Sequence, residues 1–199
     1  RAAHLQRTGD LHTDTLIKIY TAYEDACQRG GLVDFGELLL RSHEIWLNKP
    51  ELLAHYQQRF RFLLVDEFQD TNTIQYAWLR VLAGEKAFVT AVGDDDQSIY
   101  GWRGAQIENI QRFTEHFSNV HTVRLEQNYR STATILKAAN AVIDNNRGRM
   151  GKELWTDSVE GDLISVFAAF NEQEEARFIV DRISACVEGG GMRKDCALL

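Results

Sequence analysis

The feature that most constrains the fold is a change in the spacing of apolar residues at Phe62. The continuous apolar run Phe62–Val65 is typical of a parallel strand covered on both faces. Beyond it, strand-like runs alternate with segments whose apolar residues recur every three or four positions. We predict helices at 72–82 and 107–117, and strands at 87–92 and 122–125. Such alternation indicates βαβ units, and hence an α/β fold with a parallel sheet and flanking helices.

Before Phe62 the pattern is helical. Over residues 16–27, apolar side chains recur at three- and four-residue spacing, until a Gly-Gly pair at 30–31 ends the helix. Asp34, with a glutamate three residues later, resembles a capping box at the start of a second helix. Pro50 suits the first position of a third helix. An all-helical segment therefore precedes the α/β part.

The remaining sequence continues the alternation. We predict a helix at 135–143, a long polar connection at 144–161, a strand at 163–167, a helix near 176–187 and a last strand at 196–199. The chain does not begin with methionine, and no turn follows the last predicted strand. We therefore expect it to be an internal piece of a longer protein.

Composition limits the classes of protein to consider. Hydrophobic residues make up 44% of the 199 residues and charged residues 26%, as in a folded globular chain. No apolar run approaches the ~18 residues of a membrane span, and the three cysteines form no C-x-x-C pair. We expect a cytoplasmic protein without a membrane segment, a disulfide framework or a zinc site. The net charge of −7 disfavours a dedicated nucleic-acid binder, although local patches could still serve.

Two adjacent carboxylates follow the first predicted strand. Asp66 and Glu67 would lie at its carboxyl end, the edge where open α/β sheets bind ligands. Phosphoryl transfer from ATP needs a carboxylate that holds Mg²⁺ and a group that orients or deprotonates the attacking water. Asp66 suits the first role and Glu67 the second, in a Walker-B arrangement. A solvated acidic turn would carry the same residues, so this motif alone leaves both interpretations open.

A loop at 92–105 follows the second predicted strand and should lie at the same edge of the sheet. Its Gln97 offers an amide that can contact a phosphate or a water. Tyr100, Trp102 and Arg103 combine aromatic faces with a cation, as platforms that stack single-stranded bases do. These aromatic residues could also be core anchors, but a Trp-Arg pair flanked by glycines in a polar loop is a poor core element. The first two aspartates of the loop are better explained as solvated, helix-capping groups.

A third polar segment, residues 125–132, joins a predicted strand to a helix capped by Ser131 or Thr132. Arg130 lies at this junction. Opposite a pair of carboxylates, it could neutralise charge that develops on the γ-phosphate of ATP. Taken alone, Arg130 is better explained as a surface ion-pair residue.

The three segments together resemble the UvrD/Rep-type superfamily-one DNA helicases. DEFQDTN at 66–72, VGDDDQSIYGWRGA at 92–105 and LEQNYRST at 125–132 resemble motifs II, III and IV of that family in order and spacing. The resemblance extends over 31–50 and 140–157, and so covers nearly the whole chain. It implies a RecA-like ATPase fold, ATP and Mg²⁺ as cofactors, and 3′-to-5′ translocation on single-stranded DNA. It also implies unwinding at duplex junctions in bacterial DNA repair, with repair proteins as candidate partners.

For the nucleotide, the resemblance implies a role for five residues. Asp66 and Glu67 would bind Mg²⁺ and activate water, and Gln97 would couple the γ-phosphate to DNA. Tyr129 resembles the residue that stacks on adenine, and Arg130 resembles an arginine finger.

For DNA, the resemblance implies that Tyr100, Trp102 and Arg103 contact the single strand. The local charge agrees modestly with DNA binding, because residues 121–155 carry six Lys or Arg and three Asp or Glu in an otherwise acidic chain. We therefore expect a basic strip beside the nucleotide cleft.

The resemblance divides the chain into three parts. Residues 1–60 resemble the end of a helical insertion subdomain, 61–126 the carboxyl-terminal part of the first RecA-like lobe, and 127–199 the start of the second lobe. The phosphate-binding loop of the family, G-x-x-x-x-G-K-[ST], is absent from the 199 residues, and the Gly151-Lys152 pair lacks the Ser or Thr that must follow. We therefore expect an incomplete P-loop NTPase fold that does not hydrolyse ATP or unwind DNA by itself.

Two alternatives stay open. One is a helicase-nuclease subunit of the RecB or AddA type, which a nuclease module in the complete protein would indicate. The other is a non-catalytic module that binds single-stranded DNA or a repair partner through the same loops. A gene that also lacks the phosphate-binding loop would favour that second alternative.

Overall fold

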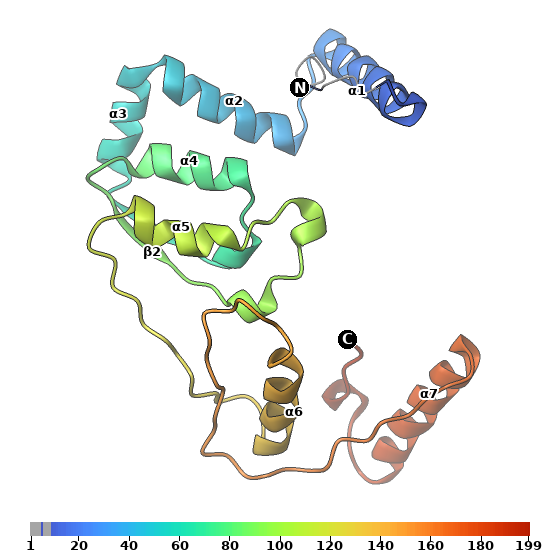
Figure 1. Cartoon of the computed structure of the whole chain (residues 1–199). Helices are drawn as coiled ribbons and strands as arrows, with labels where there is room; N and C mark the ends of the chain where they lie inside the picture. The colour runs from blue at the N-terminus through green and yellow to red at the C-terminus, as the bar shows by residue number, and fades with distance from the viewer. Residues whose placement is uncertain (1–4, 6–8) are drawn as a thin grey trace. The chain divides into compact units, whose positions relative to one another are not determined.

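The computed structural model describes residue 5 and residues 9–199, which form two compact units whose elements are labelled in Figure 1. The first unit comprises the described residues up to Val123 together with Gly148–Met150, and the second comprises Arg124–Arg147 and Gly151–Leu199. The motifs at 66–72 and 92–105 belong to the first unit, and the motif at 125–132 belongs to the second.

The first unit begins with three helices, as predicted: α1 (Leu11–Gly30), α2 (Phe35–Asn48) and α3 (Pro50–Arg59). Gly31 ends α1 in the left-handed conformation (φ 63°) that favours glycine. Asp34 caps α2, because one carboxylate oxygen accepts the Glu37 N–H (2.7 Å) and the other accepts the Tyr23 hydroxyl of α1 (2.8 Å). These two bonds hold the pKa of Asp34 below its ordinary value and join α1 to the start of α2.

A two-stranded parallel sheet follows, made of β1 (Phe62–Val65) and β2 (Phe88–Ala91). Helix α4 (Thr73–Ala83) connects the strands in a βαβ unit, and α5 (Glu108–His116) comes after β2. All four elements lie where the spacing of apolar residues predicts them. Asn72 starts α4 with a capping box, in which its side chain accepts the Gln75 N–H and the Gln75 side chain accepts the Asn72 N–H (both 2.9 Å).

Aromatic packing joins the helical segment to the sheet-bearing part of the unit. The rings of Trp46 in α2 and Trp78 in α4 lie 4.6 Å apart between centroids. The indole N–H of Trp78 donates to the Ser42 hydroxyl (3.0 Å), and the Gln57 amide of α3 donates to the Val81 carbonyl (2.9 Å). Helices α2 and α3 therefore pack against α4.

The strands bury one face only. Leu63, Val65, Val89 and Ala91 pack against a core of Phe68, Tyr76 and Leu79, to which α5 adds Ile110 and Phe113. On the opposite face Phe62, Leu64 and Phe88 are exposed, Leu64 by 81%. The prediction of a strand covered on both faces is therefore wrong for the described chain, because α4 and α5 both contribute to the core on the same face.

The second unit contains α6 (Ala133–Ile143), α7 (Glu172–Glu188) and a short 3-10 helix, η5 (Arg193–Asp195). Both α-helices confirm the predicted ones, although α7 starts earlier. The strands predicted at 122–125, 163–167 and 196–199 are wrong, because these residues form no strand. Strand formation requires a neighbouring backbone, and the described residues offer these segments no partner strand.

Helix α6 follows Thr132, one of the two predicted capping residues, but the Thr132 side chain makes no capping hydrogen bond. The first amides of the helix are satisfied differently. The N–H groups of Ala133 and Thr134 donate to the carbonyl oxygens of Val159 and Glu160, at 3.2 and 3.0 Å. The end of the long polar connection therefore replaces the side-chain cap.

Among the described helices, none is long and apolar enough to cross a membrane. Cys27, Cys186 and Cys196 are free thiols.

The one-sided core yields a stability prediction. Phe68→Ala should destabilise the first unit by about 3–5 kcal/mol, because it leaves a cavity beside Tyr76 and Phe113. Phe62→Ala, on the exposed face of β1, should cost at most about 1 kcal/mol. Urea unfolding of the 199-residue chain, followed by tryptophan fluorescence, measures both losses. Equal losses would contradict a core on one face of the sheet.

Candidate functional site

The carboxyl ends of β1 and β2 bring two polar loops to one edge of the sheet. Because the strands are parallel and adjacent, the residues after Val65 and after Ala91 emerge side by side. The pairing continues past the strands, since the Val92 N–H donates to the Val65 carbonyl (2.8 Å) and the Phe68 N–H donates to the Val92 carbonyl (3.0 Å). The expectation that both loops share one edge is confirmed.

Asp66 and Glu67 follow β1 directly, and both side chains are exposed. Asp66 Oδ1 accepts the Glu67 N–H (3.0 Å), which orients the first carboxylate. Glu67 has a positive φ of 49°, uncommon for a residue with a side chain. The chain then turns into the 3-10 helix η2 (Phe68–Asp70), which buries Phe68 in the core. The core thus anchors the chain directly after the two carboxylates.

Gln69 is a site residue that the sequence reasoning missed. Its side chain is 1% exposed, and both ends of its amide are used. Nε2 donates to Glu67 Oε2 (2.7 Å), and Oε1 accepts the Asp94 N–H (3.0 Å). These partners fix which end of the amide is oxygen, because the reverse assignment would place two donors together and an oxygen against a carboxylate. No local pattern distinguishes such a buried glutamine from an exposed one.

The loop after β2 continues the series of hydrogen bonds. Asp94 caps the 3-10 helix η3 (Asp95–Gln97), its Oδ1 accepting the Asp96 N–H (3.0 Å). Asp94 Oδ2 accepts the Gln97 side-chain amide (2.7 Å). Glu67, Gln69, Asp94 and Gln97 are therefore joined in sequence, and we call this series the strand-end network. The interpretation of Asp94 as a capping residue is confirmed, but the same carboxylate also holds Gln97.

The other two aspartates of the loop bind the segment Gly148–Met150. Asp95 accepts the Met150 N–H (2.6 Å). Asp96 forms a two-pronged ion pair with Arg149, at 2.9 Å from Nε to Oδ1 and 3.0 Å from Nη2 to Oδ2, and both side chains are largely buried. Arg149 is a second contact that the sequence reasoning missed. Protein donors thus bond to all three aspartates, so we do not regard the acidic run as a metal site.

The middle of the loop exposes Trp102, whereas Tyr100 is half-buried. Trp102 is 77% exposed and lies on the 3-10 helix η4 (Gly101–Arg103). The Arg103 guanidinium carbon lies 4.9 Å from the ring centroid of Tyr100 and 4.8 Å from that of Trp102. The expectation that Trp102 is not a core residue is confirmed.

The far end of the loop returns to the segment that follows the carboxylates. Ala105 is buried and pairs with Asn72 in an isolated bridge, and the Gln106 N–H donates to the Thr71 carbonyl (2.9 Å). Asn109, the other fully buried polar side chain among the described residues, donates to the same carbonyl (3.0 Å) and to the Thr71 hydroxyl (3.2 Å). Both ends of the loop are thus bonded to residues 65–72.

The second unit carries the remaining predicted residues, Tyr129 and Arg130, in the turn before α6. Both are exposed. The Tyr129 hydroxyl donates to Gln127 Oε1 (2.7 Å), and the Arg130 N–H donates to Asn128 Oδ1 (2.9 Å). No strand precedes this turn in the described chain, so the predicted strand-to-helix junction is here a turn-to-helix junction. The carboxylates belong to the first unit and these two residues to the second.

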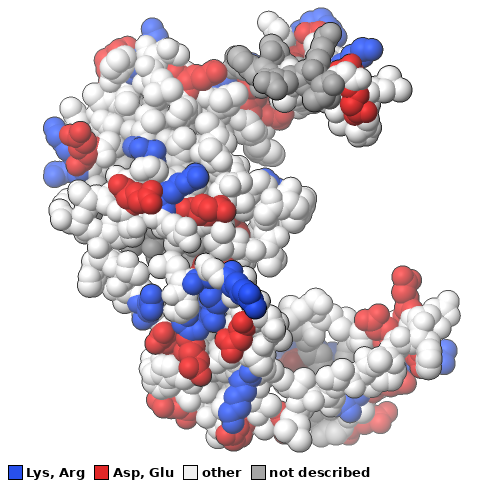
Figure 2. All heavy atoms as spheres, in the orientation of Figure 1, with Lys and Arg blue, Asp and Glu red and all other residues white. Residues whose placement is uncertain are grey.

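Charge is mixed over the molecular surface. Figure 2 shows acidic and basic side chains interspersed on the face that it draws. Among the basic residues of 121–155, Lys137 binds Glu160 (3.0 Å) and Arg149 binds Asp96. Ion pairs thus occupy part of the predicted basic strip, whose function stays a prediction.

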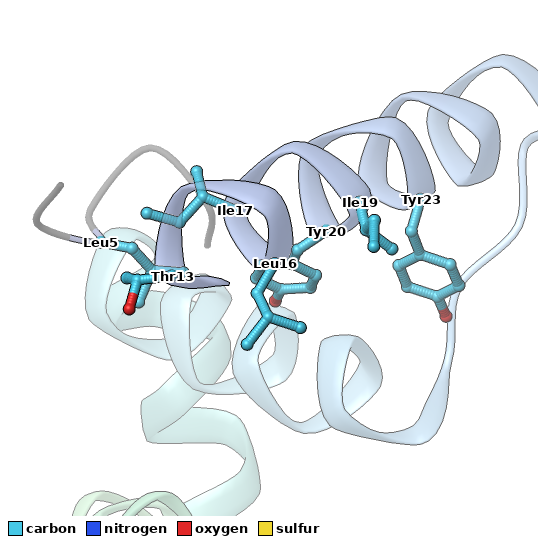
Figure 3. Close-up of a pocket in the computed structure, with 7 residues that line it drawn as sticks. All are labelled: Leu5, Thr13, Leu16, Ile17, Ile19, Tyr20 and Tyr23. Carbon is cyan, nitrogen blue, oxygen red and sulfur yellow. The ribbon is translucent and has the colours of Figure 1, made fainter. Parts of the chain in front are cut away.

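A hollow of about 580 Å³ lies along α1 (Figure 3). Leu16, Ile19, Tyr20 and Tyr23 contribute to its lining, which contains no charged side chain. It therefore offers no charged group to a phosphate or a metal ion, and the strand ends remain the candidate site.

The chain matches two domain families of known helicases. Residues 1–118 match the UvrD/REP helicase N-terminal domain, and residues 123–199 match the UvrD-like helicase C-terminal domain. The DNA helicase II proteins of Salmonella typhimurium and Escherichia coli are each 61% identical to the chain over all 199 residues. The ATP-dependent DNA helicase PcrA of Staphylococcus aureus is 41% identical over 190 residues, or 96% of the chain.

The chain spans 28% of the length of the two DNA helicase II proteins and 26% of PcrA. The two domain matches nevertheless cover nearly every residue of this chain. The chain therefore belongs to the UvrD/REP helicase family.

Proposed function

We propose that the chain is part of an ATP-dependent DNA helicase that moves 3′ to 5′ along single-stranded DNA and unwinds duplex DNA during repair. The observation that carries this proposal is the strand-end network. It joins Glu67 at the end of β1 to Gln97 in the loop that also exposes Trp102. The carboxylate that would act on the nucleotide and the aromatic surface that would stack on bases thus share one short segment of the fold. Relatives named DNA helicase II and ATP-dependent DNA helicase PcrA support the same function.

Within the complete protein, we assign the chain to three parts. Residues 1–60 would end a helical insertion subdomain, 61–126 would complete the first RecA-like lobe, and 127–199 would begin the second. The parallel βαβ unit supports the RecA-like assignment of the middle part. The exposed face of β1 and β2 is consistent with a sheet that further elements of a longer protein would cover.

The residues at the end of β1 suit a magnesium ion. Mg²⁺ prefers oxygen ligands and keeps several waters, so an exposed carboxylate at a strand end is a suitable ligand. Asp66 is exposed, and its bond to the Glu67 N–H gives its carboxylate a defined direction. When bound, Mg²⁺ neutralises charge on the β- and γ-phosphates of ATP. Asp66 would hold the ion, with Glu67 beside it.

Glu67 and Gln97 would act on the reacting groups. Glu67 would orient the attacking water and accept its proton, and the Gln97 amide would contact the γ-phosphate. In the second unit, Tyr129 would stack on adenine, and Arg130 would neutralise charge that develops on the γ-phosphate. Their exposure in the turn before α6 leaves both side chains accessible to a ligand.

Tyr100, Trp102 and Arg103 would contact the single strand. The guanidinium lies against both rings, which limits their motion and places a positive charge beside an aromatic surface. Any of the bases can stack on an aromatic ring. Such a surface therefore suits a protein that moves along DNA whatever its sequence.

Turnover requires the triphosphate to be held in place. The 199 residues contain no G-x-x-x-x-G-K-[ST] sequence, and phosphoryl transfer depends on positioning. We therefore assign ATP hydrolysis and unwinding to the complete protein and not to residues 1–199 alone.

Glu67→Gln in the complete protein should lower DNA-stimulated ATP turnover by roughly 10²–10⁴-fold, because the amide keeps the shape of the side chain but cannot accept a proton. Binding of Mg-ATP should be retained. Glu85→Gln is the matched control, since Glu85 is exposed and precedes β2 at the opposite edge of the sheet. Steady-state turnover and nucleotide titration measure the two effects. An equal loss of binding and turnover would identify Glu67 as a structural carboxylate.

Trp102→Ala in the complete protein should weaken single-stranded DNA binding by about 1–3 kcal/mol, the contribution of one base-stacking side chain. Ile99→Ala removes an exposed apolar side chain from the same loop and should change affinity less. Fluorescence anisotropy with a labelled oligonucleotide measures both. If Trp102→Ala lowers the thermal midpoint and leaves the affinity of the folded protein unchanged, the loop is not a DNA-stacking surface.

A further inference from the structure

Gln69 is the one fully buried polar side chain of the described chain that touches a proposed catalytic residue. Its amide donates to Glu67 and accepts from the backbone of Asp94. The hydrophobic core does not require a glutamine at this position, and burial of an amide is costly unless its hydrogen bonds are made. A side chain that only filled this space could be apolar, whereas the Gln69 amide bonds to a residue of each loop.

We propose that Gln69 is a positioning residue that aims the Glu67 carboxylate and makes its direction depend on the loop that carries Gln97. This inference rests on the proposed ATP hydrolysis and adds a residue to it. Gln69 does not contact the nucleotide in this proposal. It acts through Glu67.

Close backbone contact makes the link stiff. A Cβ atom added to Gly93 would lie 2.8 Å from Gln69 Oε1 and 3.2 Å from the Phe68 backbone nitrogen, so only glycine lets the two loops approach this closely. The Phe68 N–H bond to the Val92 carbonyl fixes the backbone on one side of Gln69. Displacement of the loop after β2 therefore displaces the Gln69 amide.

The strand-end network also provides the path by which a shift of the loop reaches Glu67. Three hydrogen bonds of 2.7, 3.0 and 2.7 Å connect Glu67 to Gln69, Gln69 to the Asp94 backbone, and the Asp94 carboxylate to Gln97. When Gln97 binds a phosphate, or when DNA binds at Trp102, the loop after β2 shifts, and the Asp94 backbone shifts with the loop. Gln69 then redirects Glu67. The effect falls on the rate of the chemical step and not on nucleotide affinity.

Only an amide satisfies both neighbours. Methionine at position 69 matches the length but offers neither the donor nor the acceptor. Glutamate keeps an acceptor for the Asp94 N–H but places a second carboxylate against Glu67. Glutamate therefore removes the donor to Glu67 while it keeps the bond to the loop after β2.

The experiment uses the complete protein that contains this chain. Gln69→Met should lower the kcat of DNA-stimulated ATP hydrolysis by roughly 10–100-fold, the scale of a misaligned catalytic group, with the KM for Mg-ATP within about twofold of wild type. Asn109→Leu is the matched control, because Asn109 is equally buried in the same unit and binds Thr71 outside the strand-end network. It should lower the thermal midpoint by a similar amount and leave kcat within about twofold.

Gln69→Glu supplies a second variant, which keeps an acceptor for the Asp94 N–H but offers Glu67 no donor. Its kcat should also fall by roughly 10–100-fold, with the KM for Mg-ATP within about twofold of wild type. The inference would be overturned by a Gln69→Met kcat near that of wild type, by an equal loss of kcat in Asn109→Leu, or by a near-wild-type kcat for Gln69→Glu. Should Gln69→Met fail to fold, Gln69→Glu alone decides. A wild-type protein without DNA-stimulated turnover would overturn the proposed function itself.

Discussion

The pairing of β1 with β2 is the interaction on which the rest of the site depends. Because the strands are parallel, their carboxyl ends lie at one edge, and the backbone bonds of Val92 to Val65 and Phe68 extend the pairing into the loops. Phe68 anchors the first loop in the core, directly after the two carboxylates. Residues from two separate motifs can therefore form one continuous hydrogen-bonded series.

Different parts of the loop at 92–105, which follows β2, make different contacts. Its first residues bond inward, to Gln69 and to Arg149, whereas Trp102 in its middle is exposed. Its end returns to Asn72. A segment fixed at both ends and free in the middle is suited to bind an external ligand and to pass a displacement to its anchored ends. This arrangement explains why the proposed DNA surface and the proposed water-activating carboxylate belong to the same unit.

The sequence predicts the elements whose signals are local. Helical spacing, Pro50 and the Gly-Gly pair at 30–31 locate α1 to α3, and the apolar run at 62–65 locates β1. The segments at 122–125, 163–167 and 196–199 also carry strand-like signals, yet they form no strand, because a strand also needs a partner that local sequence cannot supply. Gln69 and Arg149 were missed for a related reason: their partners Asp94 and Asp96 are 25 and 53 residues away in sequence.

Gln97 is the residue at which the nucleotide and DNA roles of the loop would meet. The most direct measurement is therefore the ratio of ATP turnover with and without single-stranded DNA, in the complete protein and in its Gln97→Ala variant. Removal of the amide breaks the bond from position 97 to the Asp94 carboxylate (2.7 Å), which is the last link of the strand-end network. The wild-type protein should be strongly stimulated by DNA, and the variant should bind DNA with unchanged affinity but lose most of that stimulation. Full stimulation in a folded Gln97→Ala variant would contradict coupling through the strand-end network.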